Sequence, residues 1–292
     1  VVVIDDDPTG SQTVHSCPLL LRWDVDTLRR GLRQPSSLLF LLADTRALTP
    51  TDAAERNRSI AAALDQALLR EGLARDQVLL VSRGDSTLRG HGVREAEALQ
   101  ASFGPFDATL HVPAFLEGGR TTVNGVHLLH GEPVHTTPFA QDRLFGFSSS
   151  DLACWLEEKS DGTIAAASVL RMSGRELDAA CGAGLPQLID RLRCFQANVS
   201  VVVDAERQEQ LTALAAAVRA LQGEKRFLFR SAASMLKALA DPGPPPLDAK
   251  GLVGLRRRAA DGTALPGLVM VGSHVPLADQ QLDRLLAAPG CA

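Results

Sequence analysis

The sequence predicts an α/β fold with three layers, in which helices flank a largely parallel sheet, followed by the beginning of a second α/β domain. Three observations lead to this prediction. Short runs of β-branched residues and leucines are apolar throughout, as in strands that are buried on both faces. Alanine-rich helical stretches separate these runs, and this alternation favours parallel pairing. Polar residues gather directly after several runs, at the sheet edge where parallel sheets bind ligands.

The first half of the chain alternates regularly between the two patterns. Residues 49–52 read TPTD, which provides a helix with an N-cap, a proline at its first position and an acid in its first turn. Gly72 ends this helix, because glycine readily adopts the left-handed conformation that closes a helix. We expect strands over residues 1–4, 38–43, 78–81 and 108–112, and helices over residues 53–70 and 93–101.

The pattern changes over residues 113–150, where glycine, threonine and histidine dominate. Residues 121–129 are expected to pair with residues 133–136, as a hairpin or as an active-site loop. A short helix capped by Ser150 or Asp151 follows. Beyond it we expect strands over residues 164–169, 199–203 and 226–229, and helices over residues 185–196, 206–221 and 232–240.

A proline-rich segment predicts a domain boundary. Residues 1–240 form the predicted first domain, and residues 241–250 form a semi-rigid linker. Residues 251–292 carry one predicted strand, 268–271, and one predicted helix, 277–286, which cannot bury a core alone. We expect residues 251–292 either to begin a second domain that is truncated in this chain or to complete the first.

Composition and charge exclude several classes of function. The 292 residues carry a net charge of −4, so a basic nucleic-acid-binding surface is not predicted. No run of about 18 apolar residues occurs, which argues against a membrane-spanning helix. The five cysteines are an odd number and form no CxxC pair, so a framework of disulfides is not predicted. The histidines show no HxxxH spacing, so the spacing of possible ligands does not predict a bound metal either. A protein of the reducing cytoplasm fits this cysteine usage best.

The first polar cluster, residues 5–10, reads DDDPTG and directly follows the first predicted strand. Neighbouring carboxylates raise one another's pKa values towards those of a useful base. Thr9 and Gly10 allow backbone amides to face a ligand. A helix cap within a solvated turn is the alternative interpretation of the same residues.

The second polar cluster, residues 82–90, reads SRGDSTLRG and follows the third predicted strand. Arg83 and Arg89 are suited to bidentate contacts with a carboxylate or a phosphate. The glycines allow a ligand to approach the backbone closely. The cluster therefore indicates an anionic, hydroxylated small molecule, with an Arg–Asp surface turn as the alternative.

The third polar cluster, residues 117–122, reads EGGRTT and lies in a long loop. Such a loop is suited to closing over the ligand, although an ordinary hairpin explains it equally well. Ser273 and His274 follow the last predicted strand and are weaker candidates for contacting a phosphate. Neither the GxxxxGK[ST] nor the GxGxxG motif of nucleotide-binding loops occurs.

The spacing Asp5-x-Asp7-x-Thr9 after a strand also matches the nucleophile motif of haloacid-dehalogenase-type phosphatases. These enzymes need a second Ser or Thr at a strand end, a lysine and a late acidic pair that binds magnesium. Ser82 is suited to the second position, but none of the four lysines stands at a convincing strand end and no late pair of aspartates follows a strand. A phosphatase is therefore the weaker alternative.

Taken together, these clusters resemble the four-carbon acid sugar kinase family. The resemblance rests on residues 5–15 (DDDPTGSQTVH), 82–90, 112–115 (VPAF), 117–120 (EGGR), 229–234 (FRSAAS) and 271–276 (VGSHVP), and so spans nearly the whole chain. The DDxTG and DSTLRG elements are specific as a pair, whereas either element alone is not.

The resemblance implies a two-domain α/β kinase. Its N-terminal domain binds a sugar acid such as threonate, erythronate or 3-oxo-tetronate, and its C-terminal domain binds ATP with Mg²⁺. On this interpretation Arg83 and Arg89 hold the substrate carboxylate, and the catalytic residue that orients or deprotonates the attacking hydroxyl is Asp7 or Asp85. The other predicted substrate-binding residues are Asp6, Thr9, Gly10, Ser86, Thr87, Gly118, Gly119 and Arg120, and the predicted cofactor-binding residues are Ser273 and His274. The sequence is compatible with a homodimer.

Two departures from the family pattern bear on function. Pro8 follows Asp7 where the kinases more often carry an apolar residue such as leucine, which indicates a distinct branch and a different substrate. The Gly-Gly-x-Thr-Ser nucleotide segment expected downstream does not occur in this chain. The chain is therefore expected to bind the acid but to lack most of its ATP site. A non-catalytic acid-binding or effector module is the second hypothesis.

Overall fold

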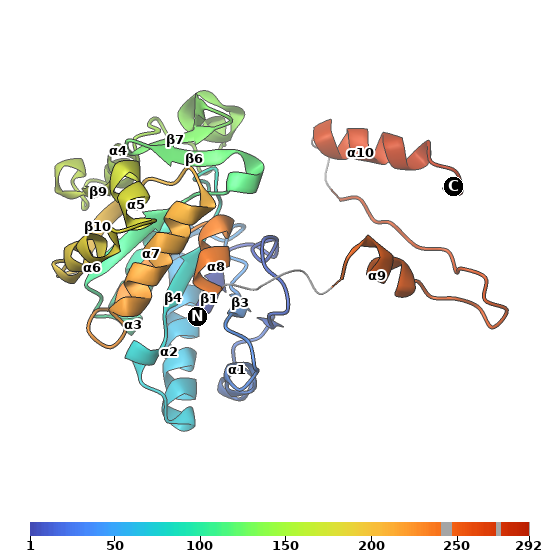
Figure 1. Cartoon of the computed structure of the whole chain (residues 1–292), viewed down its shortest axis with the longest axis horizontal. Helices are drawn as coiled ribbons and strands as arrows, with labels where there is room; N and C mark the ends of the chain where they lie inside the picture. The colour runs from blue at the N-terminus through green and yellow to red at the C-terminus, as the bar shows by residue number, and fades with distance from the viewer. Residues whose placement is uncertain (241–246, 273–275, 292) are drawn as a thin grey trace. The chain divides into compact units, whose positions relative to one another are not determined.

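The computed structural model describes residues 1–240, 247–272 and 276–291. The chain divides into two compact units, Val1–Pro244 and Pro245–Ala292. The first unit contains all three polar clusters that the sequence analysis identifies (Figure 1).

The first unit is built on an eight-stranded sheet in which every neighbouring pair of strands is parallel. The order of the strands is β2-β3-β1-β4-β11-β5-β10-β9. The prediction of a largely parallel sheet flanked by helices is therefore confirmed. The strands are β1 (Val2–Asp5), β2 (Leu19–Leu20), β3 (Leu39–Leu42), β4 (Leu80–Arg83), β5 (Ala108–Val112), β9 (Leu170–Met172), β10 (Val199–Val203) and β11 (Phe227–Ser231).

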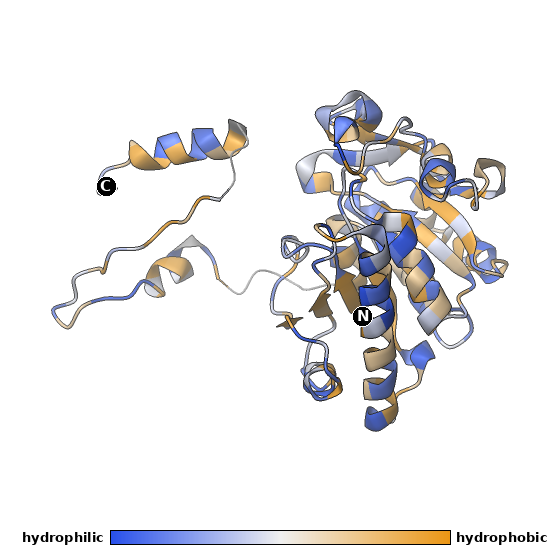
Figure 2. Cartoon of the chain, turned by 180° about the vertical axis from the view of Figure 1, so that it is seen from behind, coloured by the Kyte–Doolittle hydropathy of each residue, from blue (hydrophilic) through white to orange (hydrophobic). Residues whose placement is uncertain are grey.

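Helices cover both faces of this sheet, because the side chains of its strands are apolar on both sides. One core, around Phe229 and Leu110, packs under one set of helices, and a second core, around Leu41 and Leu80, packs under another. In Figure 2 the strands are largely hydrophobic, whereas the helices mix both colours. The first set is α5 (Gly174–Ala180), α6 (Leu185–Arg193), α7 (Gln208–Ala220) and α8 (Ala233–Ala240), and the second is α1 (Val25–Leu32), α2 (Pro50–Glu71) and α3 (Gly92–Phe103).

A third core forms where α4 (Leu152–Lys159) packs beside α3. It includes Trp155 and Leu156 of α4, Val93 of α3 and Val202 of β10. Since Val202 is near the carboxyl end of β10, this core lies next to the carboxyl ends of the strands. Short 3₁₀ helices complete the unit: η1 (Arg75–Gln77), η2 (Leu116–Gly118), η3 (Val134–Thr136), η4 (Pro138–Gln141) and η5 (Ala166–Ser168).

The capping residues predicted for α2 act as expected. The hydroxyl of Thr49 accepts a hydrogen bond from the backbone N–H of Asp52 at 3.2 Å, which satisfies one free donor of the first turn. Gly72 ends the helix in the left-handed conformation at φ 69°. Local sequence therefore determined both ends of the longest helix among the described residues.

A three-stranded antiparallel sheet follows β5 and differs from the predicted hairpin. It consists of β6 (Arg120–Val123), β7 (Val126–Leu129) and β8 (Glu132–Pro133). The predicted pairing forms in part, because Leu128 and Leu129 of β7 lie opposite Pro133 and Glu132 of β8. The prediction missed a second turn at Asn124 and Gly125, both at positive φ, which divides the predicted first strand into β6 and β7. Asp204, at the end of β10, accepts hydrogen bonds from the backbone N–H groups of Asn124 and Gly125 at 3.0 and 2.8 Å. A strand end of the main sheet thus holds this turn.

Two further predictions were wrong in detail. The strand expected over residues 164–169 lies slightly later, as β9, because the 3₁₀ helix η5 occupies half of the predicted segment. Residues 268–271, also predicted as a strand, have no regular structure. Within the described part of the second unit only one isolated bridge forms, between Arg258 and Ala264. Residues 268–271 therefore have no strand there to supply backbone hydrogen bonds, and Leu268 is 88% exposed.

The described residues of the second unit include two helices, α9 (Ala249–Gly254) and α10 (Pro276–Leu286). Several large apolar side chains of this unit are exposed, including Leu252, Leu255 and Met270. None of the helices in the described ranges is long and apolar enough to cross a membrane.

The strand order identifies the carboxyl ends of β1 and β4 as the place where a ligand site is expected. The chain leads from β1 to β3 on one side and then crosses to β4 on the other side. Loops from the carboxyl ends of β1 and β4 therefore diverge and leave room between them, which is where open α/β sheets bind ligands. The first and second polar clusters form these two loops.

The first unit is expected to fold without the second. All three cores consist of residues before position 241, so the second unit supplies none of their side chains. A chain shortened to residues 1–244 should unfold in one cooperative transition, with a Tm within about 2 °C of the full chain in calorimetry. A much lower Tm or a broad transition would show instead that the later residues complete the first unit.

Candidate functional site

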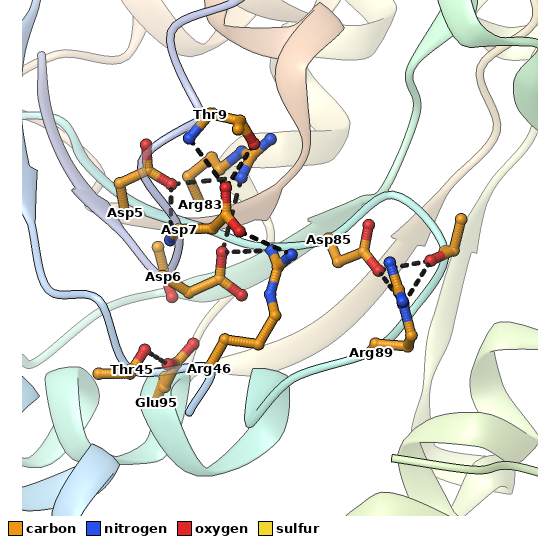
Figure 3. A network of polar contacts seen from close by, with 12 residues as sticks. Asp5, Asp6, Asp7, Thr9, Thr45, Arg46, Arg83, Asp85, Arg89 and Glu95 are labelled. Atoms are coloured by element: carbon orange, nitrogen blue, oxygen red, sulfur yellow. Dashed lines mark hydrogen bonds and ion pairs between the residues drawn. The ribbon is translucent and has the colours of Figure 1, made fainter. Parts of the chain in front are cut away.

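The site begins with an ion pair that the sheet register creates. Asp5 ends β1 and Arg83 ends β4, and the two are direct partners in the parallel pairing. Partners in register project from the same face of a sheet. Arg83 Nη1 lies 3.3 Å from Asp5 Oδ1, and both side chains are almost completely buried (Figure 3). This pair ties the first polar cluster to the second.

Asp6 lies on the other side of the loop, towards α3. Its Oδ1 atom accepts a hydrogen bond from Arg46 Nη2 at 3.0 Å, and Arg83 Nη1 lies 3.6 Å away. Its Oδ2 atom is buried and has no hydrogen-bond partner among the described residues. A Cβ atom at Gly90 would lie 3.0 Å from this oxygen, so the end of the second cluster passes close to it.

Asp7 faces the more open side of the loop, with 21% of its side chain exposed. Its Oδ1 atom accepts hydrogen bonds from the backbone N–H of Thr9 at 2.8 Å and from the Thr9 hydroxyl. Its Oδ2 atom lies 2.9 Å from Arg46 Nη1. Arg46, which follows β3, therefore bridges Asp6 and Asp7 (Figure 3). Gly10 packs against the carboxyl group of Asp5, where any side chain would overlap it.

The three neighbouring carboxyl groups differ in acidity because their surroundings differ. Burial raises the pKa of Asp5 to about 7, against the effect of the Arg83 charge. Burial, followed by the negative charge of Glu95, raises the pKa of Asp6. For Asp7, burial acts in the same direction, but hydrogen bonds from Thr9 and the charge of Arg46 lower the pKa overall. The loop thus combines two buried acids that protonate readily with one accessible carboxylate.

The second cluster forms a compact turn around Asp85. Arg89 Nε donates to Asp85 Oδ2 at 2.7 Å, and the Thr87 hydroxyl donates to the same oxygen. Although burial opposes it, the charge of Arg89 and the Thr87 hydrogen bond lower the pKa of Asp85. The guanidinium of Arg89 lies 4.9 Å from the centre of the Phe139 ring. The backbone carbonyl of Ser86 contacts His127 Nε2 at 2.7 Å, which fixes the turn to β7.

A buried ion pair supports the second cluster from beneath. Arg230, near the end of β11, donates from Nη1 to Ser82 Oγ at 2.8 Å and to Glu95 Oε2 at 2.7 Å. Glu95 also accepts a hydrogen bond from the hydroxyl of Thr45, in the loop after β3 (Figure 3). The guanidinium of Arg230 fills the space that a side chain at Gly84 would need. One arginine therefore fixes the backbone at the start of the 84–90 loop.

The third cluster approaches the second. Arg120 Nη1 donates to the Gly118 carbonyl at 2.6 Å, and the guanidinium lies 5.6 Å from the centre of the Phe115 ring. Gly119 adopts the left-handed conformation at φ 72°, which favours glycine. Burial lowers the pKa of Arg120, and the charges of Asp85 and Arg89 act on it with opposite signs. The structure therefore brings Arg120 into the electrostatic environment of Asp85 and Arg89.

The structure gathers the predicted residues of the first unit into one region, with two qualifications. Arg83 is buried and contacts Asp5 and Asp6, whereas Arg89 pairs with Asp85 and keeps 30% of its side chain exposed. Ser273 and His274 lie outside the described residues. Arg46 belongs to Asp44-Thr45-Arg46, which follows the second predicted strand and is a weaker candidate of the same positional type. Sequence reasoning missed Glu95. Glu95 could have been recognised as unusual, because it is the one carboxylate on the mostly apolar, buried face of α3.

The described residues do not offer a ready metal centre. No group of three or more histidine, cysteine, aspartate or glutamate side chains in those ranges is arranged to hold an ion. Asp5, Asp6 and Asp7 are adjacent in sequence, but Arg46 and Arg83 already neutralise their carboxylates. This set of side chains therefore does not fit Mg²⁺ without rearrangement.

Comparison with protein families identifies the class. The family model described as sugar-binding N-terminal domain matches residues 1–239. The match covers most of the chain, and the chain belongs to this family. The resemblance to the four-carbon acid sugar kinases is therefore confirmed at the level of the family.

Individual relatives agree with this assignment. A D-erythronate kinase of Heliobacterium modesticaldum is 31% identical over 150 residues, which are 49% of this chain and 32% of that protein. A domain of unknown function from Bordetella bronchiseptica, solved with bound citrate as a domain-swapped dimer, is 25% identical with a TM-score of 0.61, over 82% of this chain and 56% of that one. A Haemophilus influenzae protein shares the fold at 16% identity and a TM-score of 0.59, over 82% and 55% of the two chains. The chain thus spans about half the length of these solved relatives.

Gly84 is expected to be sensitive to any side chain. In a Gly84→Ala variant the added methyl group overlaps the guanidinium of Arg230, which Ser82 and Glu95 hold in place. We expect a loss of about 1–3 kcal/mol in the free energy of unfolding, measured by urea denaturation. Gly182→Ala is the matched control, because the nearest atom to its added methyl group lies 3.9 Å away. Equal stability of the two variants would contradict the proposed role of Arg230.

Asp5 is expected to make stability depend on pH. Its pKa is about 7 in the folded chain and about 3.9 in an unfolded one, so the folded state binds the proton more tightly. The resulting stabilisation is complete below about pH 4 and is lost as the pH rises through 7. Asp5→Asn should therefore reduce the fall in unfolding free energy between pH 4 and pH 8, measured by denaturant titration. An unchanged fall in the variant would contradict the raised pKa.

Proposed function

We propose that this chain is the substrate-binding part of an ATP-dependent kinase that phosphorylates a hydroxyl of a four-carbon sugar acid of the erythronate, threonate or 3-oxo-tetronate type. The observation that carries the proposal is the grouping of arginines with two accessible carboxylates after β1 and β4. Arg89 pairs with Asp85, Arg46 pairs with Asp7, and the charge of Asp85 acts on both Arg46 and Arg120. Two arginines match a carboxylate, and accessible carboxylates match hydroxyl groups. The D-erythronate kinase relative supports this substrate class.

In this proposal, each side chain has a role set by its surroundings. Arg89 and Arg120 bind the carboxylate of the acid, and Thr9, Thr87 and the backbone around Gly10, Ser86, Gly118 and Gly119 surround its hydroxyls. Asp7 and Asp85 are the candidates for orienting the attacking hydroxyl, because their side chains are 21% and 12% exposed whereas Asp5 and Asp6 are buried. Phosphoryl transfer depends mainly on positioning and charge stabilisation, so an ionised carboxylate that accepts the hydroxyl proton is sufficient.

ATP and Mg²⁺ are proposed as cosubstrate and cofactor from the kinase relative alone. The described residues of this chain are not assigned to either, and the role of Ser273 and His274 in contacting a phosphate stays a prediction. A cytoplasmic location and a homodimer are likewise proposals. The citrate bound by the Bordetella bronchiseptica relative, itself a hydroxy carboxylate, supports small-acid binding by this fold.

The phosphatase alternative is disfavoured by the environment of Asp5. In that motif the first aspartate attacks the phosphate, and a nucleophile must be ionised and reachable. Asp5 is 1% exposed, lies beneath Gly10 and has its pKa raised to about 7. The geometry therefore favours sugar-acid binding over phosphoryl-enzyme chemistry.

Arg89 is expected to be needed for binding the acid. Arg89→Ala removes a charge-assisted contact with the carboxylate and leaves the negative charge of Asp85 unbalanced. We expect the affinity for D-erythronate to fall by about 1.5–3 kcal/mol in isothermal titration calorimetry. Arg94→Ala is the matched control, since Arg94 pairs with Asp161 at the surface, away from the clusters, and its affinity should stay within about twofold. Equal affinities of the two variants would remove Arg89 from the site.

A further inference from the structure

A row of polar side chains crosses the sheet beneath the second cluster. Ser82 of β4, Arg230 of β11 and His111 of β5 are successive partners in the parallel register, so they project from the same face. Ser82 and Arg230 bond to each other, and Arg230 bonds to Glu95. His111 is 5% exposed, yet neither of its ring nitrogens has a hydrogen-bond partner among the described residues.

His111 lines a small cavity behind the 84–90 loop. Asp85 and Arg89 of that loop, together with Leu152 and Trp155 of α4, are part of the lining. The cavity has a volume of about 20 Å³, counted as the space open to the centre of a water molecule. This volume can hold one hydroxyl group or one water molecule. Trp155 is 6% exposed, and its Nε1–H also has no partner in the described ranges.

Three residues that line this cavity carry buried polar atoms without a hydrogen-bond partner among the described residues: His111, Trp155 and Ser231, whose hydroxyl can both donate and accept. Burial, and then the charge of Arg230, lower the pKa of His111 to about 3, so the ring is neutral and offers one donor and one acceptor. Trp155 offers only a donor. A hydroxyl group both donates and accepts, whereas a carboxylate can only accept and an ammonium can only donate. Leu88, Leu152 and Leu156 supply an apolar wall suited to the carbon that carries the hydroxyl.

We propose that this cavity binds the hydroxyl group on the carbon next to the carboxylate of the acid, and that His111 and Trp155 recognise it. Arg89 lines the same cavity and holds the adjacent carboxylate in the proposed function, on which this inference rests. The terminal hydroxyl then points away from the cavity towards Asp7. His111 and Trp155 are therefore specificity-determining residues for 2-hydroxy acids.

The test compares two ligands that differ by this one hydroxyl. D-erythronate carries it, and 3,4-dihydroxybutanoate lacks it but keeps the carboxylate and the terminal hydroxyl. Affinities of the full chain for both are measured by isothermal titration calorimetry. The wild-type chain is expected to bind D-erythronate at least tenfold more tightly, because the analogue leaves the His111 and Trp155 nitrogens unpaired.

Trp155→Phe removes the N–H and keeps an aromatic ring. This variant should lower the affinity for D-erythronate about tenfold and leave that for 3,4-dihydroxybutanoate unchanged. Trp23→Phe is the matched control, because Trp23 lies beside Arg56 and not in the cavity, and it should behave as wild type. His111→Leu should repeat the selective loss, and His111→Asn, which keeps a donor and an acceptor, should restore part of it.

The outcomes separate this inference from the proposed function. If the chain binds D-erythronate but Trp155→Phe and His111→Leu keep the wild-type preference, the cavity holds only a buried water and the inference is overturned while the function stands. If the wild-type chain binds both ligands equally, the inference is likewise overturned. If it binds neither acid, the proposed function and the inference both fail. The thermal stability of each unliganded variant shows whether a loss of binding reflects unfolding.

Discussion

The buried Arg230–Glu95 ion pair is the interaction on which the geometry of the site depends. A charge that is removed from water is costly unless a partner and hydrogen bonds compensate it, and here Ser82 and Thr45 provide those bonds. The pair joins β11 to α3, and its hydrogen bonds reach β4 and the loop after β3, so it links four elements. The loops of the candidate site are therefore positioned by a charge pair whose arginine also lines the cavity behind the 84–90 loop.

The same arrangement separates two kinds of carboxylate within one short loop. Asp5 and Asp6 are turned into the protein, where burial favours their protonated forms, and they hold Arg83 and Arg46. Asp7 stays ionised because Thr9 and Arg46 stabilise its charge. The three adjacent aspartates thus differ in role: two of them are buried and contact arginines, and the third is ionised and partly exposed at the candidate site.

Sequence reasoning reached the fold class, the ends of α2 and the three clusters, because these depend on local signals such as apolar runs, caps and glycine-containing turns. It did not reach the positions that depend on register. His111 reads as one polar residue within an apolar run, and only the pairing of β5 with β11 shows that it neighbours Arg230. The turn at Asn124 and Gly125 was missed for a related reason, since Asp204, 79 residues after Gly125, holds it.

That attachment of the small antiparallel sheet to Asp204 has a consequence for how this fold diversifies. The backbone amides of Asn124 and Gly125 are held by Asp204, whereas the turn at His130 and Gly131, between β7 and β8, is exposed and has open space around Gly131. Insertions into the turn before β8 would therefore change the shape of the small sheet without disturbing the turn at Asn124 and Gly125. Related proteins can in this way accommodate ligands of different length by changing the turn next to β8, while the bonds between Asp204 and the turn at Asn124 and Gly125 stay the same.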